Sequence, residues 1–349
     1  MQLPLADLDG AHYDLLVRAI SRVLFTEIAE ITYAQIIDGL PIADVADDTP
    51  CPIYGNHTIF EVHEELCPGM LDKAREFRAQ FQPEIMTFIV LTHLHLLHDY
   101  RTCAPGSRRF KIVLIELVAV AVHQLAALLF ELDTSMHKDD GITGWTPPLS
   151  GELYWKLYLD GPLPTLFRHG WYKDYPQYPR GVADMVGYWA EARILGGVVL
   201  FDRRDPDSNL DPDPYSGSDA NPEVDPDAVY LHSDRALLDF LLADAEPAAN
   251  PLPILGGPDN RVRVKPEEPI LETGIFRDPW ERKALTSSDG DLRLRDVINQ
   301  TDYPTFQDRS AAMGRALDRL EIFRRQQSDE PLAWWLPTHK RSEELGVTM

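Results

Sequence analysis

Four residues with metal-binding or acid–base side chains lie on two neighbouring apolar segments: His95, Asp99, Glu116 and His123. If two helices form an antiparallel hairpin about a turn at 105–106, His95 lies opposite Glu116. Asp99 is then one helical turn from His95, and His123 is two turns from Glu116. A glutamate inside an apolar helix must be neutral or partnered, because an unpaired buried charge costs several kcal/mol. We expect His95 to be that partner.

This group supports three interpretations. The first is a structural His95–Glu116 pair that holds the two helices in register. The second is a site for a divalent metal such as Fe, Mn or Zn, with His95, Asp99, Glu116 and His123 as ligands, because facing helices of bundles build metal sites from imidazole and carboxylate groups. The third is metal-free acid–base catalysis, in which Glu116 orients His95, His95 moves a proton on the substrate, and His123 is a further base.

The dipeptide His98-Asp99 also has the form of a known metal motif. It resembles the His-Asp pair of the HD-domain metal enzymes, which are all-helical. That resemblance implies His63 as an upstream ligand, with His123 and His137 as additional ligands. It is a variant of the metal hypothesis with a different ligand set.

A second group of candidate residues lies between 154 and 191. Asp184 and Glu191 are seven residues apart and share a face of a predicted helix, where they could supply ligands, an acid–base pair or salt bridges. Ten aromatic residues between 154 and 189 predict either a secondary core or a wall for an apolar or aromatic small molecule. The candidate substrate-binding residues are Arg168, Trp171, Tyr172, Trp189 and Glu191.

The same region carries a resemblance to a protein family. Residues 168–175 read RHGWYKDY, residues 178–191 read YPRGVADMVGYWAE, and residues 196–203 read GGVVLFDR. This pattern resembles a family of hypothetical proteins from filamentous fungi and covers about a fifth of the chain. The resemblance implies a lineage and no particular reaction.

Hydrophobic periodicity predicts the elements that would position these residues. The expected helices cover 12–39, 59–80 with a break near Pro68-Gly69, 83–101, 110–133, 181–194 and 305–327, with a shorter helical stretch at 151–158. Residues 196–201 and 228–232 are expected to form a small antiparallel β hairpin. The predicted fold class is therefore mainly α, a helical bundle-like single domain with one hairpin and an acidic loop insertion.

We expect one domain over 1–349, made of three successive parts. Residues 1–140 form the helical core. Residues 145–248 form an aromatic-rich segment that holds the hairpin and, at 202–227, an acidic loop with nine acidic and two basic side chains. Residues 249–349 form an extended Pro-rich segment and a C-terminal helix.

Charge and composition restrict the classes of partner that we expect. The net charge of −23 disfavours nucleic acid and anionic membrane surfaces, so we expect neither as a partner. The apolar stretch 112–132 is interrupted by Glu116, His123 and Gln124, which favours a core helix over a membrane span. Three cysteines without CxxC spacing predict neither a disulfide framework nor a zinc knuckle. With no signal-peptide pattern at the start, we expect a cytoplasmic protein.

The sequence has no P-loop, dinucleotide-binding, GxSxG, HExxH or kinase motif. Our functional hypothesis is a small-molecule enzyme, of fungal specialised metabolism by its resemblance, that uses the His/carboxylate group between the two apolar helices. The alternative is a non-catalytic acidic interaction or scaffold protein whose buried His–Glu pair is structural. The substrate, the reaction and the oligomeric state do not follow from the sequence.

Overall fold

The computed structural model describes a mainly α protein. The residues it describes are 3–4, 8, 10–47, 57–81, 87–88, 94–146, 163–169, 172–201, 235–244, 249–255, 276–278, 280–281, 305–308, 310–312 and 314. Its helices and strands are β1 (Leu3–Pro4), α1 (Gly10–Leu24), α2 (Glu27–Asp38), α3 (Ala43–Asp47), α4 (Ile59–Val62), α5 (Met70–Ala79), β2 (Thr87–Phe88), α6 (Leu94–Thr102), α7 (Arg108–Glu131), the 3-10 helix η3 (Tyr175–Gln177), α9 (Val182–Leu195) and α10 (Arg235–Leu242).

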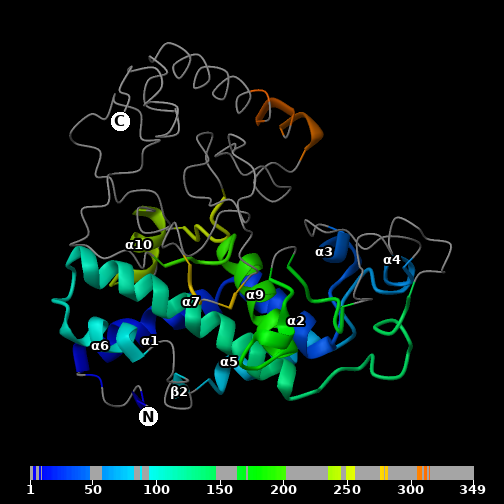
Figure 1. Ribbon diagram of the computed structural model, residues 1–349, viewed down its shortest axis with the longest axis horizontal. Helices are drawn as coiled ribbons and strands as arrows, with labels where there is room; N and C mark the ends of the chain where they lie inside the picture. Colours follow the sequence, from blue (N-terminus) through cyan, green and yellow to red (C-terminus); the bar gives the residue numbers. More distant parts are fainter. Residues whose placement is uncertain are drawn as a thin grey trace, which may run out of the picture.

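Helix α7 is the centre of the described fold (Figure 1). It begins at the N-cap Ser107, whose side chain accepts a hydrogen bond from the amide of Phe110. Its apolar residues are covered on different sides by α1, α2, α6 and α9. By length and composition α7 could cross a membrane, but most of its apolar window is buried inside the protein, as in a core helix. The predicted helix over 110–133 is therefore present, with the burial expected of a core element.

The predicted helix over 12–39 is two helices, α1 and α2. The chain breaks at Thr26, whose hydroxyl donates to the carbonyl of Val23 at 2.7 Å and accepts from the amide of Ala29 at 3.3 Å. Thr26 thus closes the first helix and caps the second, because a threonine side chain competes with the backbone for hydrogen bonds. The apolar spacing alone did not reveal this break, since both helices face the same core.

The predicted helix over 83–101 begins later than expected. Residues 87–88 form the short strand β2, which pairs antiparallel with β1, and the described helix α6 covers Leu94–Thr102. Its hairpin with α7 is present near the turn, where Asp99 on α6 and Arg109 on α7 form an ion pair at 2.7 Å. The predicted helix over 181–194 agrees with α9, and the break expected near Pro68-Gly69 lies between α4 and α5.

The predicted β hairpin is not supported. Gly196 has φ +87° and is the C-cap of α9, so the glycine pair ends a helix and does not begin a strand. The following residues, up to Phe201, form no strand, and the carbonyl of Phe201 accepts a hydrogen bond from the amide of Phe276 at 3.1 Å. The expected partner strand at 228–232 lies outside the described residues, as do the predicted helix at 151–158 and the acidic loop at 202–227.

One large hydrophobic cluster joins segments that are far apart in the chain. It contains residues of α1, α2, α5, α6, α7, α9 and α10, together with Leu252 and Ile254. The backbone amide of Ile254 donates to the carbonyl of Leu195 at 3.1 Å, which holds this segment against the end of α9. Of the predicted C-terminal helix over 305–327, residues 306–308 and 310–312 are described and are helical. The division of the chain into three parts stays a prediction.

Candidate metal centre

Four metal-binding side chains meet at the C-terminal end of α2. Asp38 is the last residue of that helix, His63 follows α4, Cys67 precedes α5, and His137 lies in the loop after α7. One ligand atom from each lies within 4.8 Å of the others, and Asp38 and His63 are buried. We call these four residues the Asp38 cluster.

The loop after α7 reaches Asp38 because it caps the open end of α2. The last carbonyl groups of a helix have no partner within the helix. The hydroxyl of Thr134 donates to the carbonyl of Ile37 at 3.3 Å, and the hydroxyl of Ser135 and the amide of Met136 donate to the carbonyl of Asp38 at 3.2 and 3.0 Å. These bonds fix the backbone directly before His137.

Gly39 makes this close approach possible. It ends α2 with φ +103°, a left-handed conformation that favours glycine. A Cβ atom at this position would lie 1.8 Å from Oγ of Ser135. The loop can therefore cross the helix end only because residue 39 has no side chain.

The segment between α4 and α5 carries the other two ligands. The carbonyl of His63 accepts a hydrogen bond from the amide of Ala43 at 2.8 Å, which joins this segment to α3. The amide of Cys67 donates to Oδ2 of Asp38 at 2.8 Å, and its carbonyl accepts from the amide of Met70, the first residue of α5. Hydrogen bonds within the protein thus hold the backbone around both His63 and Cys67 in place.

The two imidazole rings are oriented by their outer nitrogens. Nδ1 of His63 lies 3.0 Å from the carbonyl oxygen of Pro41, and Nδ1 of His137 lies 2.5 Å from Oδ2 of Asp140. Because a carbonyl oxygen only accepts, Nδ1 of His63 must carry the proton. Each Nε2 then faces Asp38, at 3.3 Å from Oδ2 for His63 and 3.3 Å from Oδ1 for His137. Metal-bound histidines in proteins have the same arrangement, with the outer nitrogen donating to a carbonyl or carboxylate.

Asp38 lies in the middle of the cluster with a side chain that is 0% exposed. Its Oδ2 accepts from the Cys67 amide, whereas its Oδ1 is buried without a hydrogen bond. Within the described part of the chain, no lysine or arginine pairs with this carboxylate. Burial alone would raise the pKa of Asp38, but the hydrogen bonds with His63 and Cys67 outweigh it and lower that pKa. A buried carboxylate oxygen that accepts no hydrogen bond and lies near two imidazole nitrogens is a candidate for a cation ligand.

The chemistry of the four donors favours zinc. A thiolate, two imidazole nitrogens and one carboxylate oxygen form a set that Zn²⁺ binds with tetrahedral geometry. Mg²⁺ and Ca²⁺ prefer oxygen ligands and more of them. Burial and the nearby Asp38 raise the pKa of the Cys67 thiol, whereas a bound metal cation would favour the thiolate.

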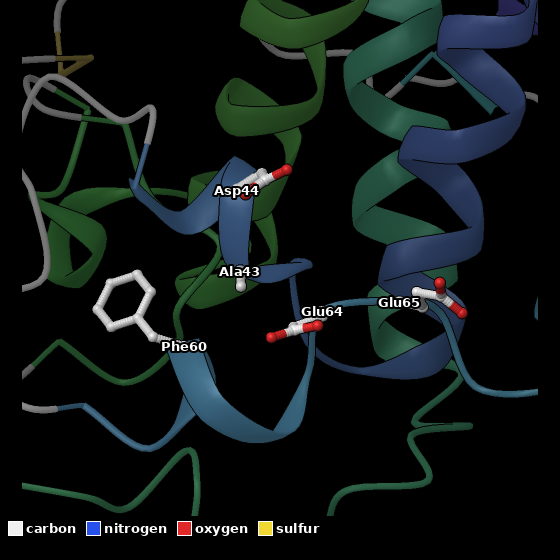
Figure 2. A pocket seen from close by; sticks show the side chains of 5 residues that line it. All are labelled: Ala43, Asp44, Phe60, Glu64 and Glu65. Carbon is white, nitrogen blue, oxygen red and sulfur yellow. The ribbon is translucent and has the colours of Figure 1, made fainter.

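A shallow acidic depression is lined in part by the segment that carries His63 and Cys67. It has a volume of about 480 Å³ and is lined by Ala43 and Asp44 on α3, Phe60 on α4, and Glu64 and Glu65 on the turn that follows, as Figure 2 shows. Glu64 and Glu65 lie in the chain between the ligands His63 and Cys67. Three carboxylates and no basic side chain line this depression, so its potential attracts cations.

The residues expected to form the α6–α7 site are spread along the two helices. Asp99 pairs with Arg109 near the turn, Glu116 is buried in the middle of α7, and His123 is buried towards its end. Among the described side chains, Asp99, Glu116 and His123 do not form one set of ligand atoms. The backbone of His95 lies in α6, but its side chain lies outside the described residues, so the predicted His95–Glu116 pair and the ligand set that includes His95 stay predictions.

His123 contacts the two carboxylates of α9. Its Nε2 lies 3.2 Å from Oδ1 of Asp184, and its Nδ1 lies 3.7 Å from Oε2 of Glu191. Oε2 of Glu191 also pairs with the buried guanidinium of Arg277, and Oε1 accepts from the amide of Val199 at 2.7 Å. We call His123, Asp184, Glu191 and Arg277 the His123 cluster. It joins His123, which sequence analysis assigned to the site between the two apolar helices, with Asp184 and Glu191, which it assigned to the region 154–191.

The His123 ring is tightly packed. A Cβ atom on Gly187 of α9 would lie 2.6 Å from this ring, and Tyr188 makes an edge contact with it at a centroid distance of 4.5 Å. Asp184 is held further by the amide of Arg180, which donates to its Oδ2 at 2.8 Å. This packing indicates a junction between α7 and α9 and leaves little room for a substrate beside His123.

The predicted substrate-binding residues are mostly buried. Arg168, Tyr172, Trp189 and Glu191 are all buried, and Trp171 lies outside the described residues. Trp189 packs against Phe167 at 4.7 Å in the main core, and Tyr172 stacks on Tyr188 at 4.6 Å in a smaller cluster. The described aromatic residues therefore form core, and their role in binding a small molecule stays a prediction.

Sequence reasoning missed Asp38 and Cys67 and found His63 and His137 only through the HD-domain resemblance. In that resemblance the partners were His98 and Asp99, but His98 is exposed and Asp99 pairs with Arg109. The four residues of the Asp38 cluster span 38 to 137, and the one local signal is the short spacing from His63 to Cys67. Such a spacing resembles no common zinc motif.

Comparisons with known proteins give no homologue on which to rest an assignment. The chain matches no protein-family model, and neither a curated protein nor a solved structure is significantly similar to it. The chemistry of the two clusters is therefore what indicates a function.

Proposed function

We propose that this protein binds Zn²⁺ through Asp38, His63, Cys67 and His137, and that the metal joins three segments of the fold. One observation carries the proposal. Oδ1 of Asp38 is buried without a hydrogen bond, in a group where two imidazole Nε2 atoms and a thiol also converge. Without a metal, Nε2 of His63 hydrogen-bonds to Oδ2 of Asp38 at 3.3 Å. Metal binding would release the proton of that bond, so that both imidazoles carry their proton on Nδ1 and the four inward atoms are lone-pair donors that a cation would neutralise.

The proposed role is that of a structural clamp. Four protein ligands are typical of structural zinc sites, whereas catalytic sites keep one position open for water or substrate. The ligands come from the end of α2, the segment between α4 and α5, and the loop after α7. Binding one ion would tie these three segments together, and the binding free energy would add to the stability of the fold.

A metal-dependent small-molecule enzyme is the second candidate. It is favoured by two features: Cys67 and His137 are only half-buried, and two residues that line the acidic depression of about 480 Å³, Glu64 and Glu65, lie in the chain between His63 and Cys67. A zinc ion that is accessible on that side could accept a fifth ligand. A small-molecule substrate would then enter through the depression, and this candidate replaces acid–base chemistry at the tightly packed His123.

The test is metal analysis of the purified protein together with Co²⁺ titration. We expect one equivalent of zinc, and a Co²⁺ spectrum with tetrahedral bands and a thiolate charge-transfer band. Cys67→Ser should remove the charge-transfer band, and Asp38→Asn should weaken binding while it keeps an acceptor for the Cys67 amide. His123→Gln is the matched control, because it removes an equally buried imidazole and should bind metal like the wild type.

Two outcomes would change the proposal. Failure of the wild type to bind Zn²⁺ or Co²⁺ after reconstitution would exclude the metal centre. Loss of metal in Glu116→Gln but not in Asp38→Asn would move the site to the α6–α7 hairpin. If azide alters the Co²⁺ spectrum of the wild type, the ion has an open position, and the enzyme is favoured over the clamp.

A further inference from the structure

Asp140 is fixed at both of its carboxylate oxygens. Its Oδ2 lies 2.5 Å from Nδ1 of His137, and its Oδ1 accepts from the amide of Ile142 at 2.9 Å. The same loop is anchored on the other side of His137, where the amide of His137 donates to Oγ of Ser135 at 3.0 Å. Neither the backbone nor the carboxylate next to this imidazole can therefore move independently.

The two histidines of the Asp38 cluster have different outer partners. His63 donates from Nδ1 to the neutral carbonyl of Pro41, whereas His137 faces the carboxylate of Asp140. A carboxylate acceptor fixes the tautomer more strongly than a carbonyl and makes Nε2 a better electron donor to a metal. His137 lies on the loop after α7, whereas the backbone of His63 is bonded to Ile59 of α4 through its amide and to Ala43 of α3 through its carbonyl. It is thus the ligand whose orientation depends most on a side chain.

We propose that Asp140 is a positioning residue for zinc, which holds His137 in the Nδ1–H tautomer so that Nε2 is free to bind the ion. This inference rests on the proposed zinc site and adds a residue to it. Loss of such an outer partner typically lowers metal affinity by about 10–100-fold.

Asp140→Asn tests this role with little change in shape. An asparagine has one acceptor oxygen where the aspartate has two, so it cannot serve both His137 and Ile142 as acceptor. If its amide group faces His137, the imidazole must accept at Nδ1, and the proton moves to Nε2, where it blocks the metal. Asp139→Asn is the matched control, because Asp139 is the preceding residue, is exposed like Asp140, and its substitution removes the same charge from the same loop.

The experiment measures zinc affinity by competition with a chromophoric chelator, and the tautomer of His137 by nitrogen NMR of the zinc-free protein. We expect Asp140→Asn to bind zinc about 10–100-fold more weakly than the wild type, and Asp139→Asn to bind like the wild type. The NMR spectrum should show Nδ1–H in the wild type and in Asp139→Asn, and increased Nε2–H in Asp140→Asn. The thiolate charge-transfer band of the Co²⁺ form should persist in all three proteins.

The outcomes separate this inference from the zinc proposal. If the wild type binds no zinc, the metal centre itself is wrong. If the wild type binds zinc but Asp140→Asn and Asp139→Asn have equal affinities, Asp140 does not position the ligand. If Asp140→Asn binds weakly with the His137 tautomer unchanged, Asp140 acts only through the turn at Ile142, and the positioning role is overturned.

Discussion

The Asp38 cluster and the His123 cluster use the same residue types in opposite ways. In each, a buried imidazole lies close to carboxylate oxygens: His63 and His137 face Asp38, and His123 lies between Asp184 and Glu191. The difference is the kind of basic partner. Arg277 pairs with Glu191 in the His123 cluster, whereas the described basic partners of Asp38 are imidazoles, of which His63 has a pKa that Asp38 raises against the effect of burial.

This difference in basic partners distinguishes the Asp38 cluster, as the candidate metal site, from the His123 cluster. A buried carboxylate must be neutralised by a proton, a basic side chain or a bound cation. Arg277 supplies the charge from within the chain, and its pKa is raised because the charge of Glu191 outweighs the effect of burial. The Asp38 cluster instead offers a thiol and two imidazoles, which are ligands as well as polar groups. We infer that the charge balance, more than the presence of histidine, identifies the metal site.

The largest effect is expected from Arg277→Met. This change removes the buried cation and leaves Glu191, with a 0% exposed side chain, near other carboxylates. Removal of one partner of a buried ion pair typically costs about 3–5 kcal/mol. We expect a loss of that size in the free energy of unfolding, measured with urea, and no change in zinc affinity.

A double-mutant cycle sharpens the result. Glu191→Gln in the Arg277→Met background removes the stranded charge and should restore part of the lost stability. If Arg277→Met also abolished zinc binding, the two clusters would not be independent, and the comparison between them would fail.

The next largest expected effect is the increase in the free energy of unfolding when zinc binds. A ligand that binds only the folded state stabilises it by about 2.7 kcal/mol when its free concentration is 100 times its Kd. We expect this gain for the wild type and for Arg277→Met, but not for Asp38→Asn at the same zinc concentration. Urea unfolding of each protein with zinc and with a chelator measures the difference. Equal gains in the wild type and in Asp38→Asn would place the metal elsewhere.

Two glycines give a smaller, paired test. Gly39→Ala would bring Cβ to 1.8 Å from Ser135, and Gly187→Ala would bring Cβ to 2.6 Å from the His123 ring. We expect each to lose about 1–3 kcal/mol of stability, as overpacked sites do. Only Gly39→Ala should also weaken zinc binding, because it displaces the loop that carries His137. The measurements are urea unfolding and Co²⁺ titration, and a loss of affinity in both variants would contradict the proposed separation.

The sequence predicted the helices better than the site. The apolar pattern located α7 and α9 because both are buried over most of their length, and the spacing of Asp184 and Glu191 correctly placed two carboxylates on one face of α9. It did not show that this face turns towards His123, because the packing of α9 on α7 depends on the small residue Gly187. A close approach of this kind leaves no periodic signal in the sequence.

The Asp38 cluster was harder to predict for a different reason. Asp38 ends a helix, where an acidic residue has no special spacing, and Cys67 was set aside because no second cysteine lies near it. The cluster forms only because the loop after α7 caps the end of α2 through Thr134 and Ser135. That contact joins residues about 100 positions apart, so no local motif could indicate it.

The smallest expected effect is the pH-dependent contribution of Asp184 to the free energy of unfolding. Burial alone would raise the pKa of this carboxyl group, but its hydrogen bonds with His123 and the Arg180 amide outweigh burial and lower the pKa below the usual 3.8. The charged carboxylate therefore stabilises the fold above about pH 4, and this contribution is lost as the pH falls through the lowered pKa.

The substitution Asp184→Asn tests this pH dependence of stability. At pH 7 we expect the variant to be about 1 kcal/mol less stable than the wild type, as for one hydrogen bond in a charged network. The gap should close below pH 4, because the wild type then loses its charge as well. Urea unfolding of the zinc-free proteins at pH 7, 5 and 3 measures it, with Asp72→Asn as an exposed control whose stability should stay close to that of the wild type throughout. A gap that stays constant after the pH has fallen through the lowered pKa of Asp184 would mean that Asp184 acts through packing alone, and the His123 cluster would then be a steric junction instead of an ionic one.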